Sequence, residues 1–339
     1  MAFDDYTTYR EITAQTQAWA QALELVQRME FGHLAGEYPQ VVFCGCGSTY
    51  YLSLAGAALF QELTGRAARA VPSGELLLNP GNFLTDQSTL LIAVSRSGST
   101  TETVKAIAEF KRQKRGDVLV ISNYEERLAS FADAKIIIPA GQEQSVAQTR
   151  SFASLYVAAT ALGARMAGRG DLLDAMTALP EAGEQLLDRY AALARELGER
   201  ASYDRVYFLG SGSRHGLACE ANLKMKEMSL THGEAFHFLE FRHGPMSMVN
   251  ASTLILGLVS ESNAPQEQAV LSDMRALGGT TISLGESGVD IAFESGVPEP
   301  VRGVLYLPVL QMLAFHRSLA KGLNPDRPNN LTAVVKLDP

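Results

Sequence analysis

Hydroxyl side chains are concentrated in one short segment of the chain. Residues 95–101 read Ser-Arg-Ser-Gly-Ser-Thr-Thr, so five of these seven positions carry a hydroxyl group. The segment follows the apolar run Leu90–Val94 and opens a helical pattern, and the N–H groups at the start of a helix bind anions. Because it contains no Gly-Lys-Ser/Thr sequence, we expect a small phosphate ester as its ligand rather than a nucleotide. The alternative is ordinary helix capping by a hydroxyl residue together with Glu102.

A second glycine-containing turn, Gly45-Cys46-Gly47-Ser48-Thr49-Tyr50, presents two more hydroxyl groups. It differs from the dinucleotide-binding turn G-x-G-x-x-G because Tyr50 replaces the third glycine, and no acidic residue follows at the ribose position. We interpret the segment as a tight turn that presents Ser48 and Thr49 to a ligand. The alternative is that these residues serve the geometry of the turn alone.

A candidate for proton transfer lies on a helix that the pattern predicts around residues 217–229. Glu220 and Glu227 flank an apolar stripe on this helix. The stripe consists of Leu217, Ala221, Met225 and Met228. A carboxylate at the edge of a buried face can move a proton between adjacent carbon atoms. The alternative is that Glu227 forms surface ion pairs with Lys224 and Lys226.

Three histidines, His232, His237 and His243, follow this helix. His243 precedes Gly244-Pro245, so we expect it in a rigid turn, either as an ordinary loop histidine or as part of a site. The spacing is not H-E-x-x-H, so the histidines do not predict a zinc site.

Cysteine usage and charge limit the class of protein further. Cys44, Cys46 and Cys219 are interpreted as small buried residues, because no second ligand pair has matching spacing. The net charge of −8 and the absence of a basic cluster argue against nucleic-acid binding. The N-terminus lacks the features of a signal peptide, and no run of about 18 apolar residues predicts a membrane span. We therefore predict a cytoplasmic protein without a membrane partner.

The chain contains an internal repeat with an offset of 165 residues. Gly45, Gly47 and Ser48 recur as Gly210, Gly212 and Ser213, and Glu62 recurs as Glu227. A repeat of this length predicts a duplicated α/β domain rather than a solenoid.

Short apolar runs alternate with helical patterns along both copies, which predicts parallel sheets covered on both faces. The predicted strands are Val41–Cys44, Leu90–Val94, Val118–Ile121, Ile136–Ile138, Val206–Leu209, Thr253–Val259 and Thr281–Leu284. The predicted helices are 9–30, Tyr50–Thr64, 102–115, 149–168, a connecting helix 171–200, Leu217–Ser229 and 308–321.

Six ordered motifs resemble those of tandem sugar isomerase (SIS) domain proteins. They are CGSTYY at 46–51, SRSGSTTET at 95–103, EQSVAQTRSF at 143–152, LKMKEMSLTHGEAF at 223–236, FRHGP at 241–245 and NPDRPNNL at 324–331. The chain is most similar to the isomerase half of glucosamine-6-phosphate synthase and to stand-alone glucosamine-6-phosphate deaminases and fructosamine-6-phosphate deglycases. The resemblance implies an α/β fold of two flavodoxin-like SIS domains, usually assembled as a homodimer.

The resemblance also implies roles for individual residues. The phosphate-binding hydroxyls would be those of Ser95, Ser97, Thr100 and Thr49, with Ser48 beside them and Arg96 in place of the synthase glutamine. Val146 and Gln148 match the loop that lines the sugar. Glu227 matches the carboxylate that transfers the C1/C2 proton. His243 matches the histidine that opens the sugar ring and that reaches the neighbouring subunit's site.

The chain departs from the synthase pattern in ways that bear on its activity. It shows no glutaminase domain and no N-terminal nucleophilic cysteine, so we do not expect glutamine-dependent amination. Asn329 and Ala333 stand where the synthase tail has Arg and Lys. Whether Lys336, three residues further on, replaces the lost tail lysine is left open.

These observations predict the following organisation: an N-terminal helical segment 1–30, a first SIS domain 31–170 that binds the phosphosugar, a linker helix 171–200, a second SIS domain 201–323 and a tail 324–339 over the active site. The predicted function is isomerisation with deamination or deglycation of an amino sugar 6-phosphate, without a cofactor or a metal. The alternatives are an aldose–ketose isomerase of another sugar phosphate and a non-catalytic sugar-phosphate sensor.

Overall fold

The computed structural model describes residues 2–36 and 38–333, and their contacts divide them into two compact units. The β1 unit holds residues 14–36, 38–143, 150–177 and 332–333. The β6 unit holds residues 2–13, 144–149 and 178–331. Each unit therefore contains segments that are distant in the sequence, and each is described by itself below.

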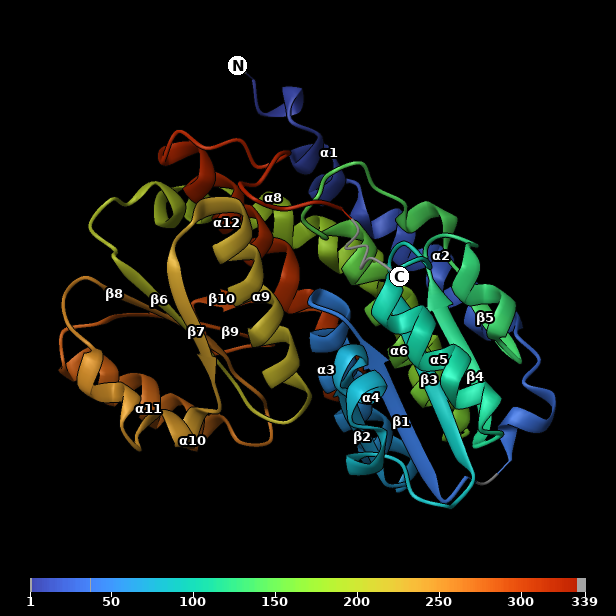
Figure 1. Cartoon of the computed structure of the whole chain (residues 1–339). Helices are drawn as coiled ribbons and strands as arrows, with labels where there is room; N and C mark the ends of the chain where they lie inside the picture. The colour runs from blue at the N-terminus through green and yellow to red at the C-terminus, as the bar shows by residue number, and fades with distance from the viewer. Residues whose placement is uncertain (1, 37, 334–339) are drawn as a thin grey trace. The chain divides into compact units, whose positions relative to one another are not determined.

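The β1 unit is built on a parallel sheet whose strands, within the described residues, follow the order β2-β1-β3-β4-β5 (Figure 1). The strands are β1 (Gln40–Gly45), β2 (Ala68–Pro72), β3 (Thr89–Ser95), β4 (Gly116–Ser122) and β5 (Ala134–Ile137). β1 and β3 are buried along their whole length, as expected for central strands of a sheet with helices on both faces. The helices are α2 (Gln15–Arg28), α3 (Ser48–Thr64), α4 (Ser73–Leu78), α5 (Thr101–Arg112), α6 (Arg150–Met166) and α7 (Gly170–Ala175).

The two faces of this sheet carry different helices. Val42, Cys44 and Leu91 pack in one cluster with Ile107 and Phe110 of α5. On the other face α3 packs against β1, and α6 packs against α3 and α2. The apolar runs of the sequence therefore form the middle layer of a three-layer structure.

The β6 unit repeats this architecture with the strand order β7-β6-β8-β9-β10 among its described residues. The strands are β6 (Arg205–Gly210), β7 (His232–Phe236), β8 (Thr253–Leu258), β9 (Thr280–Gly285) and β10 (Ile291–Ala292), all paired in parallel. The helices are α1 (Thr7–Thr13), α8 (Leu179–Glu199), α9 (Ser213–Ser229), α10 (Phe238–Phe241), α11 (Ala264–Ala276) and α12 (Leu307–Ala320). Both sheets thus have the order 2-1-3-4-5 of flavodoxin-like folds, which confirms the predicted fold class.

The internal repeat is visible in the bounds of the elements. β1 and β6, and likewise α3 and α9, begin and end 165 residues apart. The two helices have the same length, so no insertion separates the turn from the end of the helix in either copy.

Two predicted helices are divided in the structure. The segment 9–30 forms α1 and α2, which belong to different units. The segment 171–200 forms α7, a 3₁₀ turn Met176–Ala178 and α8. Pro180 lies in the first turn of α8, where its missing N–H is tolerated and where it prevents continuation of the preceding helix. The prediction of one continuous connecting helix is therefore wrong.

No helix in the described part of the chain is both long enough and apolar enough to cross a membrane. The predicted domain boundaries, 1–30, 31–170, 171–200, 201–323 and 324–339, stay a prediction.

Candidate functional site

The loop after β3 is held in one conformation by a glycine and a buried hydroxyl. Gly98 has φ +64°, and a Cβ atom there would lie 2.9 Å from the carbonyl oxygen of Tyr124. The Ser95 hydroxyl accepts a hydrogen bond from the Gly98 N–H at 3.0 Å and is buried. Ser95 therefore stabilises the loop from inside, and glycine at position 98 is required by both conformation and space.

The exposed side of the same loop carries the remaining hydroxyls. Ser97, Ser99, Thr100 and Thr101 are each partly exposed. The Ser97 hydroxyl accepts hydrogen bonds from the N–H and the hydroxyl of Ser99, both at 3.2 Å. Thr100 is the N-cap residue of α5, so its neighbours present N–H groups at the positive end of a helix of twelve residues. This combination of hydroxyls and helix N–H groups is suited to an oxyanion.

The turn after β1 lies beside this loop, because β1 and β3 are hydrogen-bonded neighbours. The order of the strands reverses between them, and in open parallel sheets ligands bind at such a switch point. Ser48 and Thr49 are buried at the start of α3. The Thr49 hydroxyl accepts the Cys46 N–H at 2.9 Å and donates to the Cys46 carbonyl at 3.0 Å. In this structure the Thr49 hydroxyl therefore serves the turn, the alternative that the sequence left open.

Arg96 makes contacts that the sequence did not predict. Its buried guanidinium lies 3.4 Å from the carboxylate of Glu143, which is itself fully buried. It also donates a hydrogen bond to the carbonyl oxygen of Ala333 at 2.5 Å. Arg96 thus links the loop 95–101 to the tail of the chain. The predicted contacts of Arg96 and Ala333 with a substrate stay predictions. Lys336 lies outside the described residues.

Val146 and Gln148 lie on the loop 144–149 of the β6 unit, and both are half-buried. The Oε1 atom of Gln148 is buried and accepts no hydrogen bond from the described residues. A buried acceptor of this kind is costly unless a ligand or water provides a donor. This observation fits the predicted role of Gln148 in lining a site.

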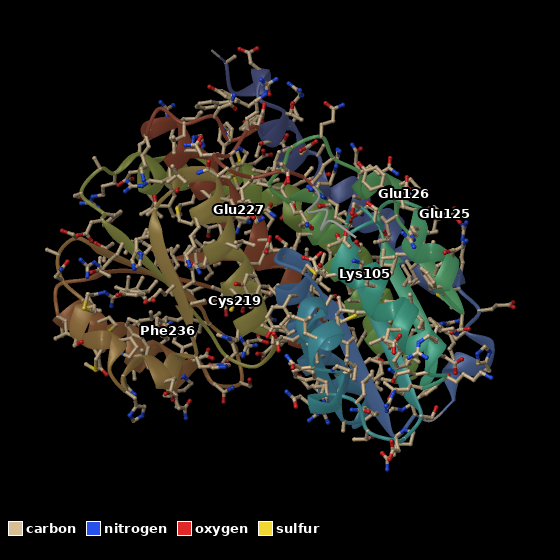
Figure 2. All side chains as sticks on the ribbon, viewed as in Figure 1. Lys105, Glu125, Glu126, Cys219, Glu227 and Phe236 are labelled. Atoms are coloured by element: carbon tan, nitrogen blue, oxygen red, sulfur yellow. The ribbon has the colours of Figure 1, made fainter. Side chains whose placement is uncertain are left out.

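α9 carries a chain of three charged side chains. The side chains of Lys224 and Glu220 are each 1% exposed, and the Lys224 ammonium lies 3.3 Å from the Glu220 carboxylate. The same ammonium donates a hydrogen bond to Glu227 Oε2. Glu227 is 19% exposed at the end of this chain, and it is found on the same helix as Cys219 in Figure 2. The ion pair with Lys224 that the alternative interpretation expected is present, but it lies at the edge of the buried face and not on the open surface, because the lysine is buried.

The sequence analysis named Lys224 only as a surface partner of Glu227 and missed that it is buried between two carboxylates. The signal was present in the repeat, because the same offset of 165 places Lys224 opposite Leu59 and Glu220 opposite Ala55. Both first-copy residues are buried and apolar. A buried ion pair costs more to form than apolar packing at the same positions, so a functional reason for it is expected.

His243 lies in the turn after α10. The residue is exposed, and its backbone N–H donates a hydrogen bond to the carbonyl oxygen of Glu240 at 2.9 Å. Gly244 follows with φ +130° and Pro245 begins a 3₁₀ turn, so the predicted turn is present. In the described part of the chain no hydrogen bond or ion pair joins His243 to Glu227.

Two histidines and a cysteine form a separate cluster on the β6 unit. The rings of His215 and His237 are stacked with centroids 3.9 Å apart, and His215 Nε2 lies 3.6 Å from the Cys219 sulfur. Burial and the neighbouring His237 lower the pKa of His215 to about 4. Burial raises the pKa of Cys219 to about 11 and that of Cys44 to about 12. Within residues 2–36 and 38–333, no three His, Cys, Asp or Glu side chains are arranged to hold a metal ion.

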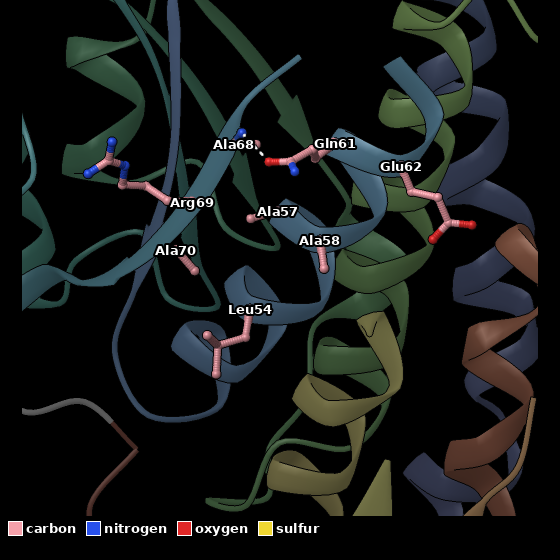
Figure 3. Close-up of a pocket in the computed structure, with 8 residues that line it drawn as sticks. All are labelled: Leu54, Ala57, Ala58, Gln61, Glu62, Ala68, Arg69 and Ala70. Carbon is pink, nitrogen blue, oxygen red and sulfur yellow. Dashed lines mark hydrogen bonds between the residues drawn. The ribbon is translucent and has the colours of Figure 1, made fainter. Parts of the chain in front are cut away.

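A shallow groove of about 510 Å³ on the β1 unit contains none of the predicted site residues (Figure 3). It lies between α3 and the edge strand β2, and Gln61 closes one part of it by accepting the Ala68 N–H at 3.0 Å. Its lining residues are Leu54, Ala57, Ala58, Gln61, Glu62, Ala68, Arg69 and Ala70.

Comparison with known proteins identifies the repeated unit. The model of the SIS domain family matches residues 34–165 and 201–295. The chain is 28% identical over 333 residues to glutamine–fructose-6-phosphate aminotransferase (isomerizing) of Methanothermobacter thermautotrophicus, a match that covers 94% of this chain and 54% of the relative. It is 29% identical over 310 residues to the protein of the same name from Halobacterium salinarum, covering 86% and 51%. The chain thus spans about half the length of the curated relatives it matches.

Solved structures show the same fold over nearly the whole chain. The glucosamine-6-phosphate deaminase of Thermotoga maritima superposes with a TM-score of 0.82 at 28% identity, covering 98% of this chain and 100% of that one. The C-terminal domain of glucosamine-fructose-6-phosphate aminotransferase from Francisella tularensis gives 0.85 at 20% identity, covering 95% and 98%.

Proposed function

This chain belongs to the SIS domain family, and from that premise we propose that it is a phosphosugar isomerase that removes an amine from an amino sugar 6-phosphate. The proposal covers both deamination and deglycation. It is supported by the likeness to a glucosamine-6-phosphate deaminase along the whole of both chains.

One observation carries the proposal: the buried chain Glu220–Lys224–Glu227 in the second copy. The first copy shows that the fold needs no charge at the two buried positions, since Ala55 and Leu59 fill them. Lys224 holds one oxygen of Glu227 and thereby orients the carboxylate at the partly exposed end of the chain. A carboxylate held in this way is suited to move a proton from one carbon to its neighbour.

The proposed reaction begins when the loop 95–101 binds the phosphate and His243 assists opening of the sugar ring. Glu227 then takes the proton from C2 of the open-chain aldehyde and returns it to C1, through an enolamine. The product is an imine at C2, and water hydrolyses it to the ketose 6-phosphate and ammonia. A fructosamine 6-phosphate carries its amine on C1, so for this substrate the proton moves from C1 to C2, and water hydrolyses the resulting C1 imine to the aldose 6-phosphate and a free amine. In both directions the proton taken from one carbon is returned to its neighbour, so the step requires no external oxidant or reductant.

The proposal is tested by a substrate panel on the purified chain. The panel contains glucosamine 6-phosphate, N-acetylglucosamine 6-phosphate, fructoselysine 6-phosphate, and fructose 6-phosphate with ammonia, with products followed by mass spectrometry and with a Glu227→Gln preparation as background. Release of ammonia or lysine above this background supports the proposal. Turnover of a sugar phosphate that carries no amine would assign a simple isomerase instead, and binding without turnover would assign a sensor.

We also propose that His243 acts in the site of a second subunit of a homodimer. Its exposure, and the lack of a link to Glu227 in the described residues, are consistent with this arrangement. Inactive Glu227→Gln and His243→Asn chains should recover activity when mixed and allowed to exchange, because a mixed dimer has one site with both groups intact. Absence of recovery after proven exchange would place both residues in one subunit's site.

A further inference from the structure

We propose that Glu11, on the first helix of the chain, is a positioning residue for the loop 144–149. The proposal rests on the proposed function, because it takes Val146 and Gln148 on this loop to line the sugar. Glu11 lies more than 130 positions before this loop in the sequence, and both segments belong to the β6 unit.

The Glu11 carboxylate holds the beginning of the loop through three donors. It accepts the N–H of Gln144 at 2.6 Å, the N–H of Ser145 at 3.3 Å and the hydroxyl of Ser145. The side chain is only 4% exposed. Hydrogen bonds to an ionised acceptor are stronger than neutral ones, and only a carboxylate offers two oxygens that accept without also donating.

The helix that carries Glu11 is itself anchored. Thr8, Glu11 and Ile12 share the buried face of α1 at helical spacing. At the start of the helix, the Asp326 carboxylate accepts the N–H groups of Thr7 and Thr8 at 2.9 and 2.7 Å, and the Thr8 hydroxyl at 2.7 Å. These contacts hold the helix of Glu11 in place independently of the contacts between Glu11 and the loop.

The end of the loop is held by a different element. The buried Gln311 of α12 donates a hydrogen bond to the Thr149 carbonyl at 3.3 Å, and Ala147 is buried between the two anchors. Val146 and Gln148 lie on either side of Ala147, so a shift at the Glu11 end displaces both. Misplacement of a substrate-positioning group by about 1 Å costs up to about 10²-fold in kcat/KM.

The test is Glu11→Gln, which keeps the shape but places an amide NH₂ against N–H donors. We expect the KM for the sugar phosphate to rise about 10- to 100-fold while kcat changes less than threefold, because the loop positions the substrate and does not transfer the proton. Hydrogen exchange of the Gln144 and Ser145 amides should become faster. The matched control is Glu24→Gln, which removes an exposed ion pair with Arg28 and should change neither quantity.

Calorimetry separates this proposal from the proposed function. Wild type should bind fructose 6-phosphate more tightly than inorganic phosphate, and Glu11→Gln should lose that difference while its affinity for inorganic phosphate stays within twofold. If wild type binds no sugar phosphate, the proposed function has failed. If Glu11→Gln is folded and binds fructose 6-phosphate like wild type, the positioning role is wrong. Should Glu11→Gln fail to fold, Asp326→Asn loosens the same helix from its far end, and an unchanged KM there would equally overturn the proposal.

Discussion

The helices α3 and α9 occupy equivalent places in the two copies and have the same length, yet their buried faces differ in chemistry. α3 buries Ala55 and Leu59, whereas α9 buries Glu220 and Lys224 at the same positions. An apolar pair is the cheaper solution for packing, since charges lose hydration when they are buried. The difference indicates that packing alone does not account for the charged pair, and it supports our proposal that the second copy supplies the group for proton transfer.

The loops after β3 and β8 also differ, but here the internal carboxylate is found in the second copy. Both contain a serine whose hydroxyl accepts the N–H three residues later, Ser95 with Gly98 and Ser260 with Asn263. In the second copy, however, the Glu299 carboxylate accepts the N–H and the hydroxyl of Ser262 at 3.1 and 3.3 Å. Arg214, at the position of Thr49, donates to the same carboxylate at 2.9 Å. An internal carboxylate thus occupies the N–H and hydroxyl groups of the second loop, and we expect a ligand to take its place in the first.

The largest effect is expected from removing the carboxylate at the end of α9. Glu227→Gln should lower kcat by about 10²–10⁴-fold and leave binding of the sugar phosphate nearly unchanged, because only the base is lost. Its counterpart in the first copy provides the control: Glu62→Gln should change kcat less than twofold. Steady-state kinetics of both variants decide the matter, and near-normal kcat in Glu227→Gln would refute the assignment.

Converting the charged pair to the first copy's residues separates stability from activity. Lys224→Leu leaves Glu220 buried without its cation, and we expect a loss of about 3–5 kcal/mol in the free energy of unfolding. Adding Glu220→Ala should restore stability to wild type or above, while turnover stays at least tenfold reduced because Glu227 is no longer oriented. Chemical denaturation and kinetics of the single and double variants measure the two effects. Full activity in the double variant would mean that the pair is structural.

Phosphate binding should be confined to the first copy. Titration with a sugar 6-phosphate is expected to show one site per chain, because Glu299 occupies the second loop. Ser97→Ala should weaken binding about tenfold, as for the loss of one hydrogen bond to a charged group. Ser262→Ala should leave the affinity unchanged. Two equivalent sites per chain, or equal effects of the two variants, would contradict the comparison.

The smallest expected effect is a dependence of stability on pH that arises in the second copy. The pKa of His215 is lowered from 6.5 to about 4, so between these pH values the unfolded chain binds a proton that the folded chain does not. The contribution of His215 is therefore complete above pH 6.5 and is lost as the pH falls towards 4. The equivalent position in the first copy is occupied by Tyr50 and not by a histidine. Melting temperatures between pH 7 and pH 4.5 should fall less steeply for His215→Asn than for wild type, and parallel curves would disprove this origin.

The central strands and the main helices could be predicted because their apolar runs are continuous. The edge strands β2 and β7 were missed because they are short and half-exposed, and their sequences ARAVP and HGEAF show no apolar run. β10 was missed because it has only two residues. α11 was missed as well, because only four of its thirteen residues are buried and one of these four is the charged Glu267. Periodicity reports burial, and these elements are buried on one side only.

The residues of the candidate site were predictable as types but not in their contacts. The family motifs gave Glu227, yet nothing in them showed that Lys224 is buried between two carboxylates. Likewise the motif placed Arg96 with the phosphate, whereas the structure directs its guanidinium to Glu143 and Ala333. These pairings join segments that are distant in the sequence or depend on how a helix face is buried, so they follow from the fold and cannot be seen in the local pattern.

Each of the two units is assembled from separate segments of the chain, and this limits how such chains can recombine. The chain passes between units at 13–14, 143–144, 149–150, 177–178 and 331–332. A crossover that exchanges residues 201–295 as one block, the extent of the second family match, would therefore bring in a new α9 while retaining the old Glu11 helix and the old loop 144–149. The imported block would have to fit segments inherited from another parent. Functional chimaeras are accordingly expected only when the N-terminal thirteen residues and this loop come from the same parent as the block.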